Sequence, residues 1–131
     1  MIRTGNEKLD NKTLVLPVGA GESISEATMV AIGADGYAGA AYAAAGITVA
    51  GVAMEPADNR VGADGDLHVK VRRGAFVFDN SATPANMVKE TDILKECYIE
   101  DARTVSMSAE GSSVAGRVIA VEDDGVTVEF R

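Results

Sequence analysis

Few residues in this chain have the types and spacing that chemistry requires. The chain contains one histidine, His68, and one cysteine, Cys97. His68 could act as the base for a serine nucleophile, but no serine lies in a nucleophile-elbow motif or another local motif of a Ser–His–Asp triad. Cys97 is followed by the apolar Tyr98 and Ile99, a setting that indicates a buried thiol. We therefore expect no enzymatic activity, and a small hydrolase that uses His68 is the least favoured alternative.

Metal and cofactor sites are equally poorly supported. Three aspartates of one loop, Asp58, Asp64 and Asp66, could coordinate Ca²⁺ through their carboxylates, but their spacing does not match an EF-hand loop. We interpret them as solvated turn residues. Zinc sites need more ligands than one cysteine and one histidine. The glycine-rich stretch 19–23 lacks the lysine and Ser/Thr order of a phosphate-binding loop. We expect no metal and no cofactor.

Composition indicates one globular domain without a nucleic-acid partner. The chain has 131 residues, and folding at that size buries roughly two-thirds of the unfolded chain's surface, which is enough for a core. Because the sequence has no tryptophan and only three Phe and three Tyr, that core must be mainly aliphatic. A net charge of −8 argues against binding to a phosphate backbone. The basic stretch 70–73 is interpreted as a solvated strand face or a protein contact.

The N-terminal residues show no signal peptide, and no apolar run is long enough to span a membrane. We expect a soluble chain that is made in the cytoplasm and has no membrane partner.

The C-terminal residues predict a β-hairpin. Val126, Val128 and Phe130 alternate with polar residues after an Asp124-Gly125 turn, and Asp-Gly between apolar runs is a strong hairpin signal. The preceding strand, residues 114–121, is apolar on both faces, so both faces need cover. One face belongs to the domain's own core. The other predicts self-association through Arg117, Ile119 and Val121.

A second strand signal runs through the middle of the chain. Val69 and Val71 are apolar at odd positions, whereas Phe76 and Phe78 are apolar at even positions. A one-residue slip would place the phenylalanines on the wrong face, so we expect a bulge near Gly74 that restores the phase. The sequence therefore predicts one bent strand over residues 67–78.

Several shorter strands complete an all-β pattern. Residues 13–18 predict an edge strand, because Pro17 cannot donate to a ladder. For the alanine-rich stretch 39–46 we favour loop or irregular strand over helix, because glycines interrupt it. One helical turn is expected within 91–96. Further short strands are expected at residues 28–32, 47–54, 97–99 and 104–107.

Together these signals predict a fold class and a domain division. We expect an all-β, small β-barrel or sandwich-like single domain with an extended N-terminal arm and at most a short helix. Residues 1–18 would form the arm and edge strand, and residues 19–131 the barrel-like domain.

The order of glycines, turns and strands over residues 28–131 resembles a known family, the head decoration (capsid cement) proteins of tailed bacteriophages. The resemblance is carried by Gly36-Tyr37 with the alanine-rich stretch, Gly51–Ala53, Asp58-Asn59, Gly62–Gly65, Val69–Phe76, Cys97–Asp101, Thr104-Val105, Ala115–Val118 and Gly125–Val128.

The resemblance implies a small β-barrel-like protein, usually trimeric, that binds the outer capsid surface and staples neighbouring major capsid subunits. In this chain the arm is the expected capsid contact, since an arm can add a strand to a sheet edge of its partner. The alternative is a tail- or fibre-associated adhesion module. The candidate capsid-binding residues are Ile2, Arg3, Leu9, Leu14 and Leu16.

Overall fold

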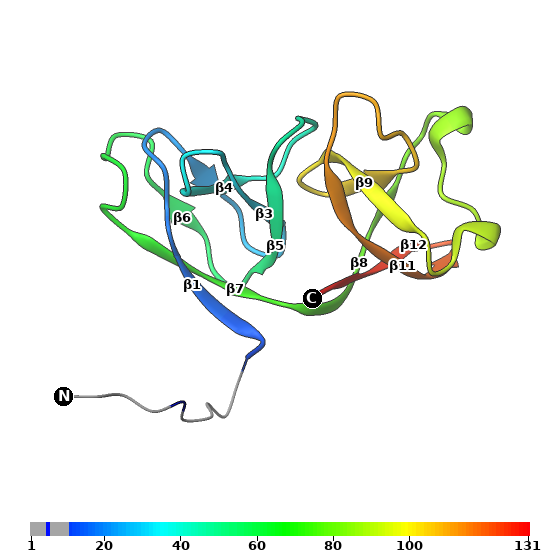
Figure 1. Cartoon of the computed structure of the whole chain (residues 1–131), viewed down its shortest axis with the longest axis horizontal. Coiled ribbons are helices and arrows are strands. Elements are labelled where there is room, and N and C mark those ends of the chain that lie inside the picture. The colour runs from blue at the N-terminus through cyan, green and yellow to red at the C-terminus, as the bar shows by residue number, and fades with distance from the viewer. Residues whose placement is uncertain (1–4, 6–10) are drawn as a thin grey trace.

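The computed structural model describes residue 5 and residues 11–131, and within them strands dominate. Strands account for 48% of the structure and helix for 5%, which confirms the predicted all-β class. The strands fall into three groups: a five-stranded sheet, a closed five-stranded barrel and a two-stranded pair. Figure 1 shows the sheet and the barrel side by side.

The first half of the chain forms the five-stranded sheet, in the order β1-β7-β5-β3-β4. Its strands are β1 (Thr13–Pro17), β3 (Met29–Ile32), β4 (Ala38–Ala40), β5 (Thr48–Ala53) and β7 (His68–Arg72). The pair consists of β2 (Ser23–Ile24) and β6 (Ala57–Asp58). β1 lies at one edge of the sheet, which confirms the expectation drawn from Pro17.

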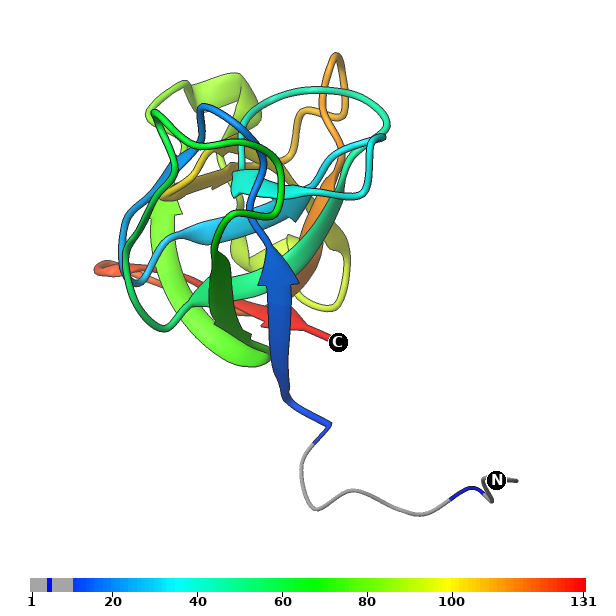
Figure 2. The same cartoon turned by 90° about the vertical axis from the view of Figure 1, so that its left-hand side faces the viewer.

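The sheet curves until its two edges nearly meet. Val18, directly after β1, forms a parallel bridge with Ala38 at the start of β4. The amide of Gly19 donates to the carbonyl of Ala38 over 2.9 Å. Figure 2 shows these strands curving around a common interior, with β1 nearest the viewer. Residues 13–18 are therefore part of the folded body, because β1 is paired and Val18 is fully buried.

The second half forms the closed barrel, in the order β10-β8-β12-β11-β9. Its strands are β8 (Gly74–Asn80), β9 (Glu96–Asp101), β10 (Thr104–Ser106), β11 (Val114–Glu122) and β12 (Gly125–Phe130). Two 3₁₀ helices lie between β8 and β9: η1 (Pro84–Asn86) and η2 (Glu90–Asp92). The helical turn expected within 91–96 thus lies earlier, because the Asp92 carboxylate accepts a hydrogen bond from the Lys89 amide and closes the turn there.

The predicted bent strand is divided between the two halves. Val69 and Val71 are buried in the sheet and Phe78 in the barrel, so the predicted change of phase is confirmed. Arg73 interrupts the strand, and Gly74 has a φ of +134°. The prediction of one strand with a bulge was wrong, because β7 and β8 pair with different sheets.

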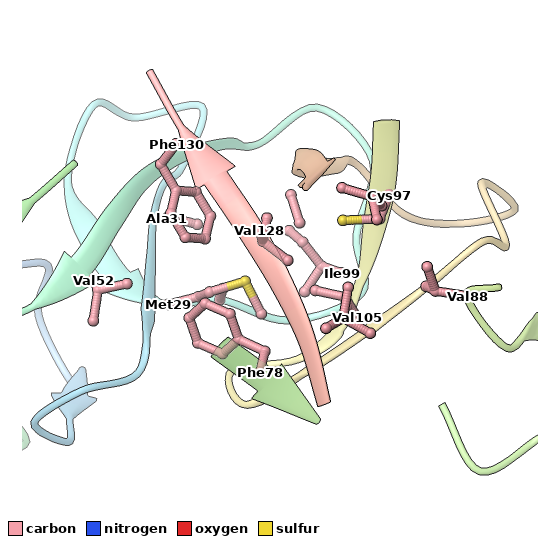
Figure 3. Packing of buried hydrophobic residues seen from close by; sticks show 14 residues of the cluster. Met29, Ala31, Val52, Phe78, Val88, Cys97, Ile99, Val105, Val128 and Phe130 are labelled. Atoms are coloured by element: carbon pink, nitrogen blue, oxygen red, sulfur yellow. The ribbon is translucent and has the colours of Figure 1, made fainter. Parts of the chain in front are cut away.

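A shared core joins the two halves. The barrel interior includes Phe78, Val128 and Phe130, and the same apolar cluster contains Met29 of β3 and Val52 of β5. Figure 3 shows Met29 beside Phe78 in this cluster. The Phe78 and Phe130 rings meet edge to face, with centroids 5.7 Å apart. A separate cluster that includes Val69 and Val71 fills the curved sheet.

The C-terminal hairpin is present, with a turn one residue earlier than predicted. Glu122 pairs with Gly125, so Asp123 and Asp124 form the two-residue turn. Gly125 has a φ of +146° and begins β12. A Cβ on Gly125 would lie 2.4 Å from the carbonyl oxygen of Phe78, so close backbone approach also requires glycine there. The predicted burial of Val126, Val128 and Phe130 is confirmed.

The alanine-rich stretch is a short strand followed by a loop, as favoured from the sequence. β4 ends at Ala40, and residues 41–47 form no helix. The Ser113 hydroxyl holds this loop against the barrel: it donates to the Ala44 carbonyl over 2.6 Å and accepts from the Ile47 amide over 3.3 Å. The two loops lie side by side at the top of Figure 1.

Candidate functional site

The two residues with the strongest chemical potential lie in different halves. His68 is exposed on β7 in the first sheet, whereas Cys97 on β9 is fully buried in the barrel. Burial raises the pKa of the Cys97 thiol to about 11, so the thiol is protonated at neutral pH. Its Sγ lies 3.6 Å from the Gly116 carbonyl oxygen. The structure thus confirms the buried thiol and places the histidine in the other half of the molecule.

The three loop aspartates form hydrogen bonds with other groups of the fold. Asp58 forms a two-hydrogen-bond pair with the exposed Arg60 guanidinium, and this pair lowers the pKa of Asp58 to about 2. Asp64 accepts from the Ala20 amide over 2.8 Å, and Asp66 accepts from the Ala63 amide over 2.8 Å. Among the described residues, no three metal-binding side chains are grouped.

Sequence reasoning missed the residue that organises this loop. Asn59 is only 2% exposed, and its side-chain amide donates to the carbonyls of Val18, Gly19 and Ala63 over 2.9–3.2 Å. This one side chain therefore joins the end of β1 to the loop after β6. An asparagine directly after an aspartate in a predicted loop was the available signal, since such residues often bond to nearby backbone.

The predicted capsid-binding residues have separate outcomes. Ile2, Arg3 and Leu9 lie outside the described residues. Leu14 and Leu16 lie on β1 and pack against the apolar cluster of the first sheet. Both side chains are half-buried and cover part of the chain's own core, and their assignment to an external partner stays a prediction.

The predicted self-association residues are divided by a β-bulge in β11. Val118 pairs with Val128 and Ala120 pairs with Thr127, so Ile119 is an extra residue without a partner on β12. The bulge shifts the phase of the strand, and Val121 packs against the barrel core. The bulge thus explains why residues on both sides of β11 are apolar without a second covered face. Val121 and Arg117 are half-buried and Ile119 is exposed, and self-association through these residues stays a prediction.

Ile119 belongs to a group of large apolar side chains on the outside of the barrel. We call this group the leucine patch. Leu94 is 63% exposed, Ile93 42%, and both Val114 and Ile119 37%. The Leu94 amide donates to the Val118 carbonyl over 2.7 Å, which places the Leu94 backbone against β11 next to Val118. Leu94 and Val114 line one hollow of about 780 Å³.

Leu94 adopts a strained backbone conformation that its surroundings hold in place. Its φ is +71°, and a non-glycine residue rarely adopts such a conformation without compensation from its surroundings. Two hydrogen bonds clamp the segment to β11, from the Leu94 amide to Val118 and from the Val118 amide to the Lys95 carbonyl over 2.9 Å. A strained Leu94 and a bulged Ile119 therefore present apolar side chains at one place.

Arg117 lies in the same hollow as Leu94. It pairs across the barrel surface with Glu96 on β9 and with Glu129 on β12. Within the described part of the chain, however, its guanidinium forms no ion pair. Apolar side chains beside a cation without an ion pair are suited to protein recognition, where arginine and large apolar residues supply much of the binding energy.

Among the described residues, no helix combines the length and the apolar character that crossing a membrane would need.

Comparison of the chain with protein-family models, with curated proteins and with solved structures found no match.

Proposed function

We propose that this chain is a structural decoration protein of a phage head, which binds the outer surface of the capsid and stabilises contacts between major capsid subunits. The proposal adds to the family resemblance one observation, the leucine patch. A surface that exposes apolar side chains beside Arg117 serves association better than catalysis. The proposal includes a trimeric state, a position on the virion and no enzymatic activity.

The charge of the chain is compatible with this role. At a net charge of −8, copies that are not in contact repel one another, which keeps densely covered particles apart in solution. Many copies on one lattice also bind with an avidity far above that of one contact. Both effects act without any perturbed catalytic group.

We assign capsid binding to the N-terminal residues before β1. The ladder between β1 and β7 extends to Lys12, whose carbonyl accepts from the Arg73 amide over 2.7 Å. A deletion that removes residues 2–10 therefore leaves every described strand in place. Leu14 and Leu16 lie half-buried on β1, so the capsid-facing candidates before β1 are Ile2, Arg3 and Leu9.

The deletion of residues 2–10 tests this assignment. We expect the shortened chain to keep the circular dichroism spectrum and thermal midpoint of the full chain, but to bind particles that lack the protein at least tenfold more weakly. A chain in which Gly and Ser replace residues 2–10 separates arm length from side chains and should also bind weakly. Full decoration by the shortened chain would refute the arm assignment.

Copy number tests the function itself. Quantitative mass spectrometry of purified particles from the encoding phage should find on the order of hundreds of copies per particle, because decoration follows the symmetry of the shell. A handful of copies would support the tail or fibre alternative, and absence from particles would refute the proposal.

A further inference from the structure

The outer face of the first sheet is covered over only part of its width. Met29 of β3 and Val52 of β5 belong to the core that the sheet shares with the barrel. β7 and β1 follow β5 toward the edge of the sheet, and Val69 and Val71 of β7 are buried in the separate cluster that fills its curve. Because side chains alternate along a strand, the even-numbered residues of β7 face outward, and all three are exposed. The barrel therefore leaves this part of the outer face open to solvent.

The open face and the junction after β7 carry four cations, which we call the basic strip: Lys12, Lys70, Arg72 and Arg73. Lys70 and Arg72 are exposed and lie two residues apart on β7. Lys12 continues the ladder of β1 and β7, since its carbonyl accepts from the Arg73 amide over 2.7 Å. Lys12 and Arg73 line one hollow of about 350 Å³. The strip thus runs along β7 to the point where the N-terminal residues join β1.

Most of this positive charge is not neutralised within the described part of the chain. Neither the two cations of β7 nor Arg73 forms an ion pair there. Two carboxylates lie nearby, and each has a partner of its own. Glu55 accepts from the Lys70 main-chain amide over 3.4 Å, and Glu129, which lines the same hollow, is paired with Arg131. The strip therefore keeps a net positive charge on a chain whose net charge is −8.

The neighbouring strand favours protein carboxylates over nucleic-acid phosphates as the partner of the strip. Val15 pairs with Lys70 across the ladder, which places the two side chains on one face, and Val15 is 60% exposed. An apolar side chain beside cations matches a protein surface, where apolar and charged groups are mixed, better than a continuous phosphate backbone. The net charge of −8 also repels a polyanion at long range, whereas a few carboxylates can be bound at short range.

We propose that the basic strip binds a carboxylate-bearing segment of the capsid surface. This inference rests on the proposed function, because the N-terminal residues that we assign to capsid binding join the folded body at the strip. The Arg73 guanidinium donates to the Asn11 carbonyl at this place. A capsid subunit held by these residues is within reach of Lys70 and Arg72. The arm supplies attachment, and the charge of the strip selects the face of the body that meets the shell.

Charge reversal tests the strip on particles that lack the protein. K70E/R72E should bind at least tenfold more weakly than the wild type at low salt, because attraction becomes repulsion, and its binding should lose the weakening by salt that the wild type shows. K89E/R103E is the matched control, since it makes the same change of net charge at two exposed residues outside the strip. The control should bind nearly as well as the wild type. Equal binding by K70E/R72E and the control would overturn the proposal, and thermal midpoints of all variants check folding.

Two soluble probes separate this inference from the proposed function. In an NMR titration, a short polyglutamate peptide should shift amide signals of β7 in the wild type and not in K70E/R72E, and a DNA duplex should bind more weakly than the peptide. Tighter binding of the duplex would overturn the choice of carboxylates. If the chain never binds particles, decoration is refuted, while peptide shifts confined to β7 would still support carboxylate binding and their absence would overturn it. Full particle binding by K70E/R72E would overturn the strip and leave decoration in place.

Discussion

At the scale of single residues, the Cys97 thiol affects how the stability of the fold depends on pH. It is fully buried among apolar side chains, and burial raises its pKa from 9.0 to about 11. Because the neutral thiol is the form that the interior accepts, the folded chain holds this proton at pH values where the unfolded chain has lost it. The thiol therefore makes the stability of the fold depend on pH in the alkaline range.

The sign of this linkage gives a prediction. Between pH 9 and 11 the unfolded chain loses the Cys97 proton first, so the contribution of the thiol to stability is complete below pH 9 and falls as pH rises. In urea unfolding, the stability advantage of the wild type over Cys97→Ala should shrink by about 2 kcal/mol between pH 8 and pH 10.5. Other groups titrate in this range, but the comparison with Cys97→Ala cancels them. An advantage that does not change with pH would contradict the prediction.

At the scale of elements, the junction between β7 and β8 depends on one glycine. Gly74 has a φ of +134°, where side chains with a Cβ are strained. The space around it is ordinary, since a Cβ would meet only the Phe76 ring at 3.8 Å. Any effect of substitution at Gly74 therefore comes from the backbone and not from a clash.

We expect Gly74→Ala to lower the free energy of unfolding by about 1 to 3 kcal/mol, which is the usual range for a strained backbone conformation. Chemical denaturation measures this change. Ala75→Ser, at the exposed next position of β8, is the matched control and should leave stability nearly unchanged. A Gly74→Ala variant as stable as the wild type would show that the junction relaxes to another conformation.

The same elements show which features the sequence could reveal. Alternation and turn residues were sufficient for the hairpin and for the change of phase before Phe76, because both signals are local. The division of β7 and β8 between two sheets depends on pairing with distant strands, and local alternation carries no such information. The bulge at Ile119 could not be predicted for the same reason. A strand that is covered on both faces and a strand whose phase shifts at a bulge have the same apolar run in the sequence.

The candidate site was predictable only in part. Arg117 and Ile119 stood out because they occupy alternate positions, and hence one face, of a predicted strand that is apolar on both faces. Leu94 did not, since its exposure depends on a left-handed backbone that leucine rarely adopts. Asn59 was also missed, because its carbonyl partners include residues 40 and 41 positions earlier in the chain.

At the scale of the whole molecule, Met29 joins the two halves. It is fully buried in the cluster that contains Phe78 and Phe130, and its amide donates to the Ala102 carbonyl over 2.9 Å. A core that crosses the boundary makes the sheet and the barrel depend on each other. Unfolding should therefore be one cooperative event.

Met29→Ala tests this dependence. We expect a loss of about 3 kcal/mol, typical of a buried methionine replaced by alanine. Hydrogen exchange should show that amides of the sheet and of the barrel lose protection together, although the substitution lies in β3. Met54→Ala, which changes an exposed methionine, should leave protection in both halves intact. Loss confined to the sheet would show that the halves unfold independently.

The single crossing of the chain at Arg73 has a consequence for synthesis on the ribosome. Every strand of the first sheet lies before residue 73, so this sheet can close while the barrel is still being translated. Met29 and Val52 then stay exposed to solvent until their partners on β12, the last strand to be synthesised, are available. The nascent chain thus carries an uncovered apolar face throughout the synthesis of its second half, and this interval is when a chaperone would have most to protect.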